Sequence, residues 1–342
     1  MIAVLTQSSH RRRAFTGALA LLVLALAGCG SGGSSSSSTT HAAGAARPRT
    51  AATVVAPSVL SYRLLYSLPA ALQDPGSAAL SGGRFVLMGG LDAADTSTSA
   101  VIVGDGSAAH QSATLPNAQH DAQAATLGGR VYLFGGGQFS TYDHILAFDP
   151  ASGAVSSVGT LPRPASDVAV AGDGSTAYVV GGYDGTNSLD TILSYRPGAA
   201  PRVAGHLPVA LRYAAVAVAG GGLIIAGGST PSGTASDAVY RFDPASGQVR
   251  QIGRLVQPLT HAGAAVLHGF VYLVGGRGAS TSSQTTAIWA INPTTGRIRA
   301  AGHLPQPLSD PGVVGLTTGI VIAGGRTSAG TQSGVGELTP PR

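Results

Sequence analysis

A diglycine ends a short apolar run six times in this chain, at a spacing close to fifty residues. The six copies are Gly89-Gly90, Gly135-Gly136, Gly181-Gly182, Gly227-Gly228, Gly275-Gly276 and Gly324-Gly325. Their first glycines are 46, 46, 46, 48 and 49 residues apart. A constant period of this length is too short for a domain and is typical of one propeller blade. The spacing therefore predicts six copies of one structural unit.

A Leu-Pro pair recurs in phase with the diglycines. Its copies are Leu68-Pro69, Leu115-Pro116, Leu161-Pro162, Leu207-Pro208, Leu255 followed by Pro258, and Leu304-Pro305. Only 10% of the residues are charged, and 50 of the 342 are glycine. Long helices need charged and unbranched residues, so this composition favours an all-β fold with frequent turns.

The fifth copy shows the predicted strands of one unit. Small residues over Thr260–Val266 indicate an innermost strand near an axis, and the apolar run Phe270–Val274 indicates a buried second strand. A third strand is expected over Ala287–Ile291 and an outer strand over Arg297–Gly302. The segment Asn292–Gly296 between them reads as a hairpin turn, because proline fixes φ and glycine accepts a positive φ.

This order of strand, diglycine, loop, aromatic residue, turn and outer strand resembles the kelch repeat over about residues 59–342. The aromatic residue before the turn is present as Phe148, Tyr195 and Phe242. The tryptophan that the family carries on the fourth strand is replaced by Val155, Val249 and Ile298. The resemblance implies a six-bladed β-propeller of four-stranded antiparallel blades, of a bacterial type.

The two ends of the repeat array predict how the ring closes. After the sixth diglycine we expect one more strand, at about Val335–Thr339, while Ser61–Leu68 has the pattern of a fourth strand. An N-terminal outer strand that completes the C-terminal blade would remove an open seam with unpaired edges.

The N-terminus carries an export pattern. Three arginines precede an apolar stretch that ends at Cys29, the single cysteine, in the order Leu-Ala-Gly-Cys. This resembles a bacterial lipobox, which implies a lipoprotein signal peptide over residues 1–28 and a lipid on Cys29. Residues 29–58 are rich in Gly, Ser and Ala and are expected to form a flexible tether. We therefore expect an exported protein on the outer face of the cytoplasmic membrane, by the Sec or the twin-arginine route.

Six polar residues recur at one phase of an otherwise small and apolar strand. Five lie 14 residues before a diglycine and the sixth is displaced by one position: Asp121, Asp167, Tyr213, His261, Asp310 and Asp74. One interpretation is that they cap strand ends at the mouth of the propeller. The other is a ring of four carboxylates, an imidazole and a phenol that binds a polyol or a cation. A dedicated metal site is not expected.

A second group of candidates follows the diglycines or adjoins the ring. It consists of Tyr183, Arg212, Arg277 and Arg326. Arg277 and Arg326 occupy the same phase in neighbouring blades and would suit a clamp for a carboxylate. The alternative is that they are solvated loop arginines.

The composition limits which partners and cofactors this protein is expected to bind. Without the three leader arginines, 17 arginines face 15 acidic residues, a net charge of about +2, so no nucleic-acid surface is expected. The propeller region has no cysteine, which excludes a copper site that depends on a cysteine-modified tyrosine, and no cofactor is expected.

We expect a monomeric binding module for an envelope protein or a glycan. The alternative is a sugar-modifying enzyme, similar to the six-bladed bacterial sialic-acid mutarotases, that uses the channel mouth.

Overall fold

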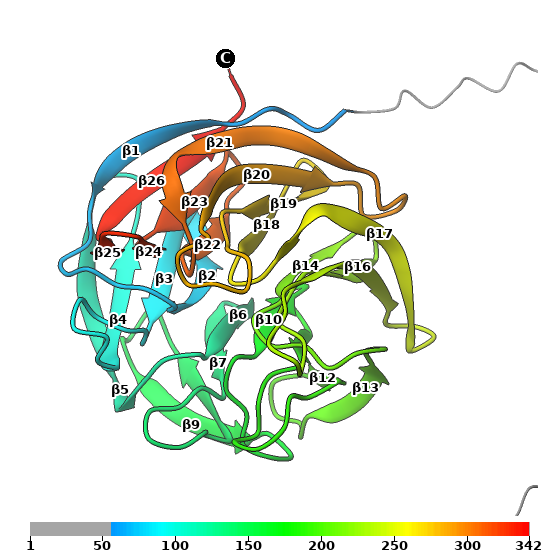
Figure 1. The fold of residues 1–342 in the computed structure, drawn as a ribbon. Coiled ribbons are helices and arrows are strands. Elements are labelled where there is room, and N and C mark those ends of the chain that lie inside the picture. Colours follow the sequence, from blue (N-terminus) through cyan, green and yellow to red (C-terminus); the bar gives the residue numbers. More distant parts are fainter. Residues whose placement is uncertain (1–55, 342) are drawn as a thin grey trace, which may run out of the picture. The chain divides into compact units, whose positions relative to one another are not determined.

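The computed structural model describes residues 56–341, so the predicted signal peptide, Cys29 and nearly all of the predicted tether lie outside the described residues. Six sheets of four antiparallel strands surround one axis (Figure 1), which confirms the predicted six-bladed propeller. Within residues 56–341, no helix is long and apolar enough to cross a membrane.

Each blade runs from an inner strand at the axis to an outer strand at the rim. The inner strands are β2 (Gly76–Leu80), β6 (Gln123–Leu127), β10 (Ala169–Gly172), β14 (Ala215–Ala219), β18 (Gly263–Leu267) and β22 (Gly312–Gly315). The second strands are β3 (Arg84–Met88), β7 (Arg130–Phe134), β11 (Ala177–Val180), β15 (Gly222–Ala226), β19 (Phe270–Val274) and β23 (Ile320–Ala323). A 3-10 turn, η1 (Ser81–Gly83), joins the first two strands of blade one.

The outer half of each blade is less buried. The third strands are β4 (Thr98–Gly104), β8 (His144–Phe148), β12 (Thr191–Tyr195), β16 (Ser236–Asp243), β20 (Thr285–Ile291) and β26 (Gly334–Thr339). The outer strands are β5 (Ala109–Gln119), β9 (Val155–Thr160), β13 (Arg202–His206), β17 (Gln248–Leu259), β21 (Ile298–Leu308) and β1 (Ser61–Ser67). In blade five, β21 runs six residues past the predicted end at Gly302.

The N-terminal strand closes the ring as predicted. The last sheet has the order β1-β26-β23-β22, with Ser61 opposite Thr339, and Figure 1 shows β1 beside β26. An ion pair of 3.0 Å between Arg63 and Glu337 spans the two strands. The expectation of a single strand after the sixth diglycine is incomplete, because β24 (Arg326–Thr327) and β25 (Gly330–Thr331) form a small hairpin before β26.

The hydrophobic core is divided into six clusters, one at each junction between neighbouring blades. Phe148, Tyr195 and Phe242, the aromatic residues predicted before the turns, are at most 1% exposed and belong to three of these clusters. Stability therefore comes from blade-to-blade packing, which a closed ring supplies on both faces of every blade.

The diglycines are contacts between blades. In blade two, Gly136 N donates a 2.8 Å hydrogen bond to the carbonyl of Ala165, in the segment that leads to blade three. Gly135 has φ 61°, and a Cβ on it would collide with the same carbonyl oxygen. Both glycines are needed because one backbone must approach another more closely than a side chain allows.

Candidate functional site

The six polar residues that recur in the sequence come together at one end of the central channel. Each lies two residues before the first residue of an inner strand, and all six line one cavity with those strands. We call Asp74, Asp121, Asp167, Tyr213, His261 and Asp310 the mouth ring. The structure thus places them where the sequence pattern predicted that they would meet.

Hydrogen bonds link the mouth ring around the axis. The N–H of Asp167 donates to the carbonyl of Asp121 at 2.9 Å, and that of Tyr213 donates to the carbonyl of Asp167 at 3.0 Å. His261, Asp310 and Asp74 continue the series at 3.3, 3.0 and 2.8 Å, each to the preceding member. The sixth link differs, because the N–H of Asp121 donates to Oδ2 of the Asp74 side chain at 3.0 Å. The ring is therefore continuous, and one of its links depends on a carboxyl group.

All six ring residues have a left-handed backbone, with φ between 52° and 58°. Asp and His tolerate this region better than most residues, whereas Tyr213 is an unfavourable choice for it. The conformation also explains why β18 begins at Gly263, two residues after His261, and not at the predicted Thr260. Glycine or asparagine would satisfy the same backbone without a charge, so the four carboxyl groups, of which that of Asp167 is buried, have no purely conformational reason.

A second tier of backbone pairs surrounds the ring. In every blade the residue just before the ring residue forms an isolated antiparallel bridge with the residue just after the diglycine. The six pairs are Gln73 with Leu91, His120 with Gly137, Ser166 with Tyr183, Arg212 with Ser229, Thr260 with Arg277, and Ser309 with Arg326. This pairing places the side chains of Tyr183, Arg212, Arg277 and Arg326 around the mouth.

Arg212 joins the ring to an aromatic residue. Its guanidinium forms an ion pair with Asp167, whose side chain is 2% exposed, and lies 4.5 Å from the ring centre of Tyr183 and 5.5 Å from that of Tyr213. A guanidinium between an aromatic face and a carboxylate is held in a fixed orientation. Arg212 and Tyr183, two of the predicted site residues, are thus brought together with the mouth ring.

His261 lies between an aromatic ring and a guanidinium. It stacks on Tyr213 with 3.8 Å between ring centres, and Nη2 of Arg277 is 3.0 Å from its Nε2. An arginine can only donate, so Nε2 accepts and the proton is on Nδ1, which is 3.0 Å from Oγ1 of Thr260. Burial and the charge of Arg277 lower the pKa of His261 to about 3, so its imidazole is neutral.

The two arginines expected to form a clamp have separate partners. Arg277 contacts His261 and the carbonyl of Ala279, whereas Arg326 pairs with Asp95 at 2.6 Å. Asp95 has no counterpart at the same phase in the other blades, and sequence reasoning missed it. Thr260 and Ser309 were also missed, although their position one residue before the ring repeats in every blade.

The ring carboxyl groups differ in acidity. Burial and the charge of Asp121 raise the pKa of Asp74 well above its usual value, and the same two causes raise that of Asp167 to about 7 although Arg212 opposes them. Burial raises the pKa of Asp310 to about 6. Burial would also raise the pKa of Asp121, but hydrogen bonds from its ring neighbours and the charge of His120 lower it. Asp121 is therefore the most acidic of the four ring carboxyl groups, and the pKa values of its neighbours Asp74 and Asp167 are raised.

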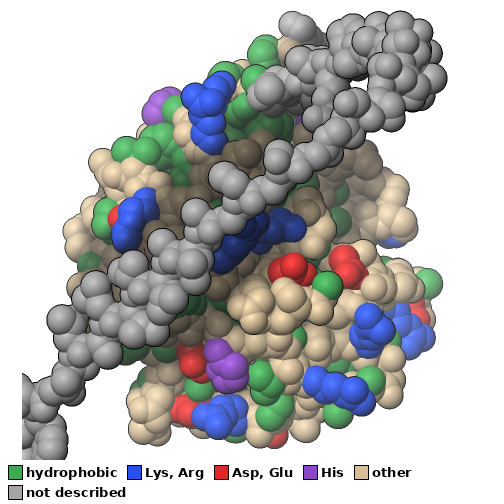
Figure 2. Space-filling view, turned by 90° about the vertical axis from the view of Figure 1, so that its right-hand side faces the viewer, with side chains coloured by type: hydrophobic (Ala, Val, Ile, Leu, Met, Phe, Trp, Pro, Cys, Tyr) green, Lys and Arg blue, Asp and Glu red, His purple; other side chains and the backbone are tan. Residues whose placement is uncertain are grey.

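Neither the mouth ring nor any other part of the described region forms a metal centre. Within residues 56–341, no three His, Cys, Asp or Glu side chains are arranged to hold a metal ion. Figure 2 shows one side of the molecule, where charged side chains lie in small groups between hydrophobic and uncharged surface. The mouth ring is thus the strongest candidate site.

Comparison with known proteins supports the fold. No family model matches the sequence, and no curated protein matches it. Solved structures do match, among them one titled "Structure of YjhT", with a TM-score of 0.68 and 17% identity. That match covers 80% of this chain and 96% of the other. At this identity the likeness shows a shared propeller fold and carries no function with it.

Proposed function

We propose that this chain is an exported, lipid-anchored propeller of kelch type that binds a small polar ligand at its mouth ring. The observation that carries the proposal is the convergence of four carboxyl groups, a phenol and an imidazole from six blades in one ring. Hydroxyl-rich ligands such as glycans offer the donors and acceptors that such a ring can pair.

The energetic cost of the ring supports a role in binding. Asp74 and Asp167 hold protons at or near neutral pH because burial disfavours their charged forms. Groups with strongly shifted pKa values in a concave site are typical of functional sites. A ring that served the backbone alone would not need these carboxyl groups, because other residues accept the same left-handed conformation at lower cost.

A thermal-shift screen tests the binding proposal. The purified protein would be melted with neutral sugars, sugar acids and peptidoglycan fragments, and a ligand that binds only the folded state raises Tm. We expect the shift to vanish in Asp167→Asn and to persist in Asp237→Asn, which changes an acidic residue on β16 away from the ring. A shift that survives in Asp167→Asn, or no shift with any ligand, would count against a small-molecule site and favour a protein partner.

The anchor needs its own test, because Cys29 lies outside the described residues. Metabolic labelling with an alkyne fatty acid should label the wild-type protein and leave Cys29→Ser unlabelled. The variant should also leave the membrane fraction. A labelled Cys29→Ser variant would reject the lipoprotein assignment.

A second candidate function is proton transfer to a bound sugar, as in a mutarotase or epimerase. The observation that favours it is an ionised carboxylate, Asp121, next to a carboxyl group, Asp167, whose pKa is about 7. Two neighbouring groups with separated pKa values can serve as base and acid near neutral pH. Mutarotation followed by polarimetry would test this: acceleration by the wild type and its loss in Asp121→Asn would support catalysis, and an unchanged rate would reject it.

A further inference from the structure

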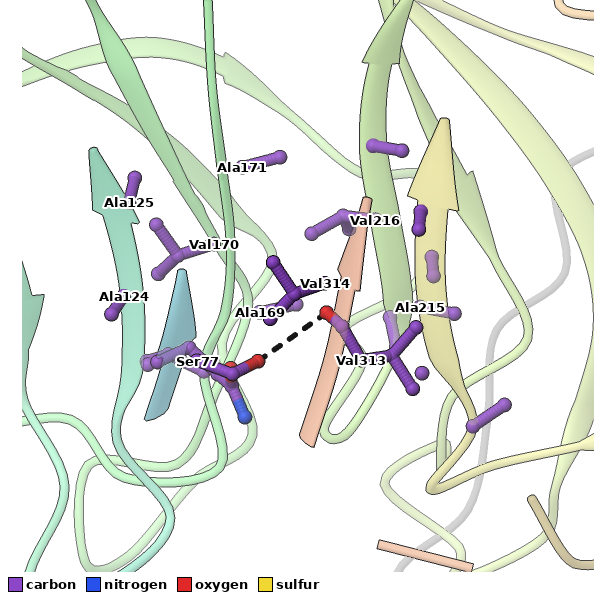
Figure 3. A pocket seen from close by; sticks show the side chains of 18 of the residues that line it. Ser77, Ala124, Ala125, Ala169, Val170, Ala171, Ala215, Val216, Val313 and Val314 are labelled. Atoms are coloured by element: carbon purple, nitrogen blue, oxygen red, sulfur yellow. Dashed lines mark hydrogen bonds between the residues drawn. The ribbon is translucent and has the colours of Figure 1, made fainter. Parts of the chain in front are cut away.

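A cavity separate from the mouth ring opens at the junction between blades two and three. It has a volume of about 100 Å³, and its wall is mainly aliphatic, with Leu161, Leu193 and Val203 among its residues. The central channel is different, because Figure 3 shows polar groups along it, among them the Ser77 hydroxyl that donates to the carbonyl of Val313 at 3.4 Å. An apolar cavity of about 150 Å³ holds a benzene molecule, so the smaller, open cavity between the blades has the size of one side chain.

The next three junctions hold an aromatic ring at the corresponding place. Leu193 is on β12, opposite the residue two positions before the diglycine, and belongs to the core cluster between blades two and three. At the same position of β16 and β20, Tyr240 and Trp289 pack in the next two clusters around the propeller. In blade six this position is Gly336, and the ring of Tyr62 lies where a Cβ would be. The cavity therefore lies where these junctions are filled by an aromatic side chain.

An exposed aromatic side chain lies in the loop beside this cavity. Phe139 is 96% exposed, the highest value among the large apolar side chains of residues 56–341. Three residues later, the carbonyl of Tyr142 accepts a 3.0 Å hydrogen bond from the N–H of Ala165, which is part of the cavity wall. Exposure of a phenyl ring to water is unfavourable, and exposed apolar groups that gather on one surface mark an interaction site.

The surface around the cavity is unusually apolar. Of the seven exposed large apolar side chains in the described region, four are in blades two and three or in the segment that leaves blade three: Phe139, Val158, Val203 and Val209. The outer strand β9 carries no charged residue. Figure 1 shows β1 and β26, the first and last strands of the chain, on the opposite side of the propeller. Neither of these terminal strands covers the apolar surface of blades two and three.

We propose that blades two and three form a twofold interface between two copies of this chain, in which the Phe139 ring of each copy fills the cavity of the other. The inference goes beyond the proposed function, because the mouth ring takes no part in it, and it departs from the monomer expected from the sequence. A surface with both a projecting aromatic ring and a cavity for one side chain is complementary to itself, as a twofold interface requires. Arg163 in the cavity wall, which pairs with Asp184 at 3.3 Å, adds a guanidinium that can stack on the inserted ring.

Sedimentation velocity of the full-length protein in density-matched detergent tests the interface. We expect dimers whose share rises with protein concentration. Phe139→Ser should weaken dimerisation at least tenfold, because buried aromatic anchors dominate the affinity of such interfaces. The control Val256→Ser changes an apolar side chain that is 67% exposed on β17 in blade four, and it should leave the dimer unchanged. A wild type that is monomeric up to about 100 µM, or equal dimerisation of the wild type and Phe139→Ser, would overturn the proposal.

A second variant fills the cavity from inside the protein. Leu193→Tyr introduces the residue type that Tyr240 provides at the same position of the next blade, so the variant should fold and keep or raise its Tm. The filled cavity should exclude the Phe139 ring and leave the protein monomeric. If Leu193→Tyr is folded by circular dichroism and dimerises as the wild type does, the cavity is not the acceptor and the proposal is wrong.

Cross-linking identifies the occupant of the cavity. With a photoreactive benzoylphenylalanine at position 139 of the full-length protein, in the membranes of expressing cells, we expect cross-links to residues 161–165 or to Val203 of a second copy. Cross-links only to a different protein, or only within one chain, would overturn the assignment to a second copy. The result is independent of the mouth ring, because Phe139→Ser should keep any sugar-induced shift found in the thermal-shift screen.

Discussion

His261 offers a test of the ring that depends on the sign and size of one pKa shift. Its pKa falls from 6.5 to about 3 on folding, because burial and Arg277 disfavour the imidazolium. Below pH 6.5 the unfolded chain binds a proton that the folded protein does not, so the stability supplied by this site is present above pH 6.5 and is lost as the pH falls toward 3. At pH 6.5 half of the unfolded chains already carry this proton, so lowering the pH from 6.5 to about 4.5 should remove about 2 kcal/mol of the free energy of unfolding, at a limiting slope of about 1.4 kcal/mol per pH unit.

The variant His261→Gln isolates this contribution. Glutamine does not titrate, and its amide oxygen can accept the hydrogen bond of Arg277. Urea unfolding of both proteins at several pH values gives two curves, and their difference removes the groups that they share, including Asp121, Asp310 and Arg212. We expect the wild type to lose about 2 kcal/mol more than His261→Gln between pH 6.5 and 4.5.

A second histidine provides the control for this experiment. His303 is exposed on β21, the outer strand of blade five, and His303→Gln is the matched substitution away from the ring. Parallel curves for the wild type and His261→Gln would show that His261 is as easily protonated in the folded protein as in the unfolded chain, and would refute the buried, neutral imidazole.

Three further predictions concern the scaffold. Gly135→Ala should destabilise the protein by about 3 kcal/mol, because Gly135 has a left-handed φ and a Cβ there would collide with the carbonyl oxygen of Ala165. The control is Gly174→Ala, where φ is also left-handed but the space around the Cβ is open, and it should cost about 1 kcal/mol. Urea unfolding measures both changes. His144→Ala should cost about 1–3 kcal/mol, because His144 is the only hydrogen-bond partner of the buried Gln119 side chain among residues 56–341. Gln119→Leu together with His144→Ala should be close to wild type, and additive single effects would contradict this. Deleting residues 61–68 should lower Tm by about 10 °C by exposing the edge of β26, and an unchanged melt would reject the closure.

Sequence alone predicted the number of blades, the closing strand and the phase of the mouth ring. These features are local and repeated: a Cβ is excluded at each diglycine by a neighbouring backbone, as at Gly135, so glycine must recur once per blade. The ring positions share a left-handed backbone just before an inner strand, so the same position recurs once in every blade. The constant period therefore reveals the number of blades and the ring positions in the sequence alone, because neither depends on knowing which distant residues are in contact.

Only the tertiary structure decided which partners the ring residues have and how acidic they are, because both depend on contacts between blades. Arg326 pairs with Asp95, a residue 231 positions earlier in the chain, whereas Arg277 contacts His261. Asp121 and Asp167 look alike in sequence, yet hydrogen bonds from ring neighbours and the charge of His120 lower the pKa of Asp121, whereas burial and the charge of Asp121 raise that of Asp167 to about 7. The period brings similar side chains to one axis, but only packing across the blade junctions sets which carboxyl group keeps its proton.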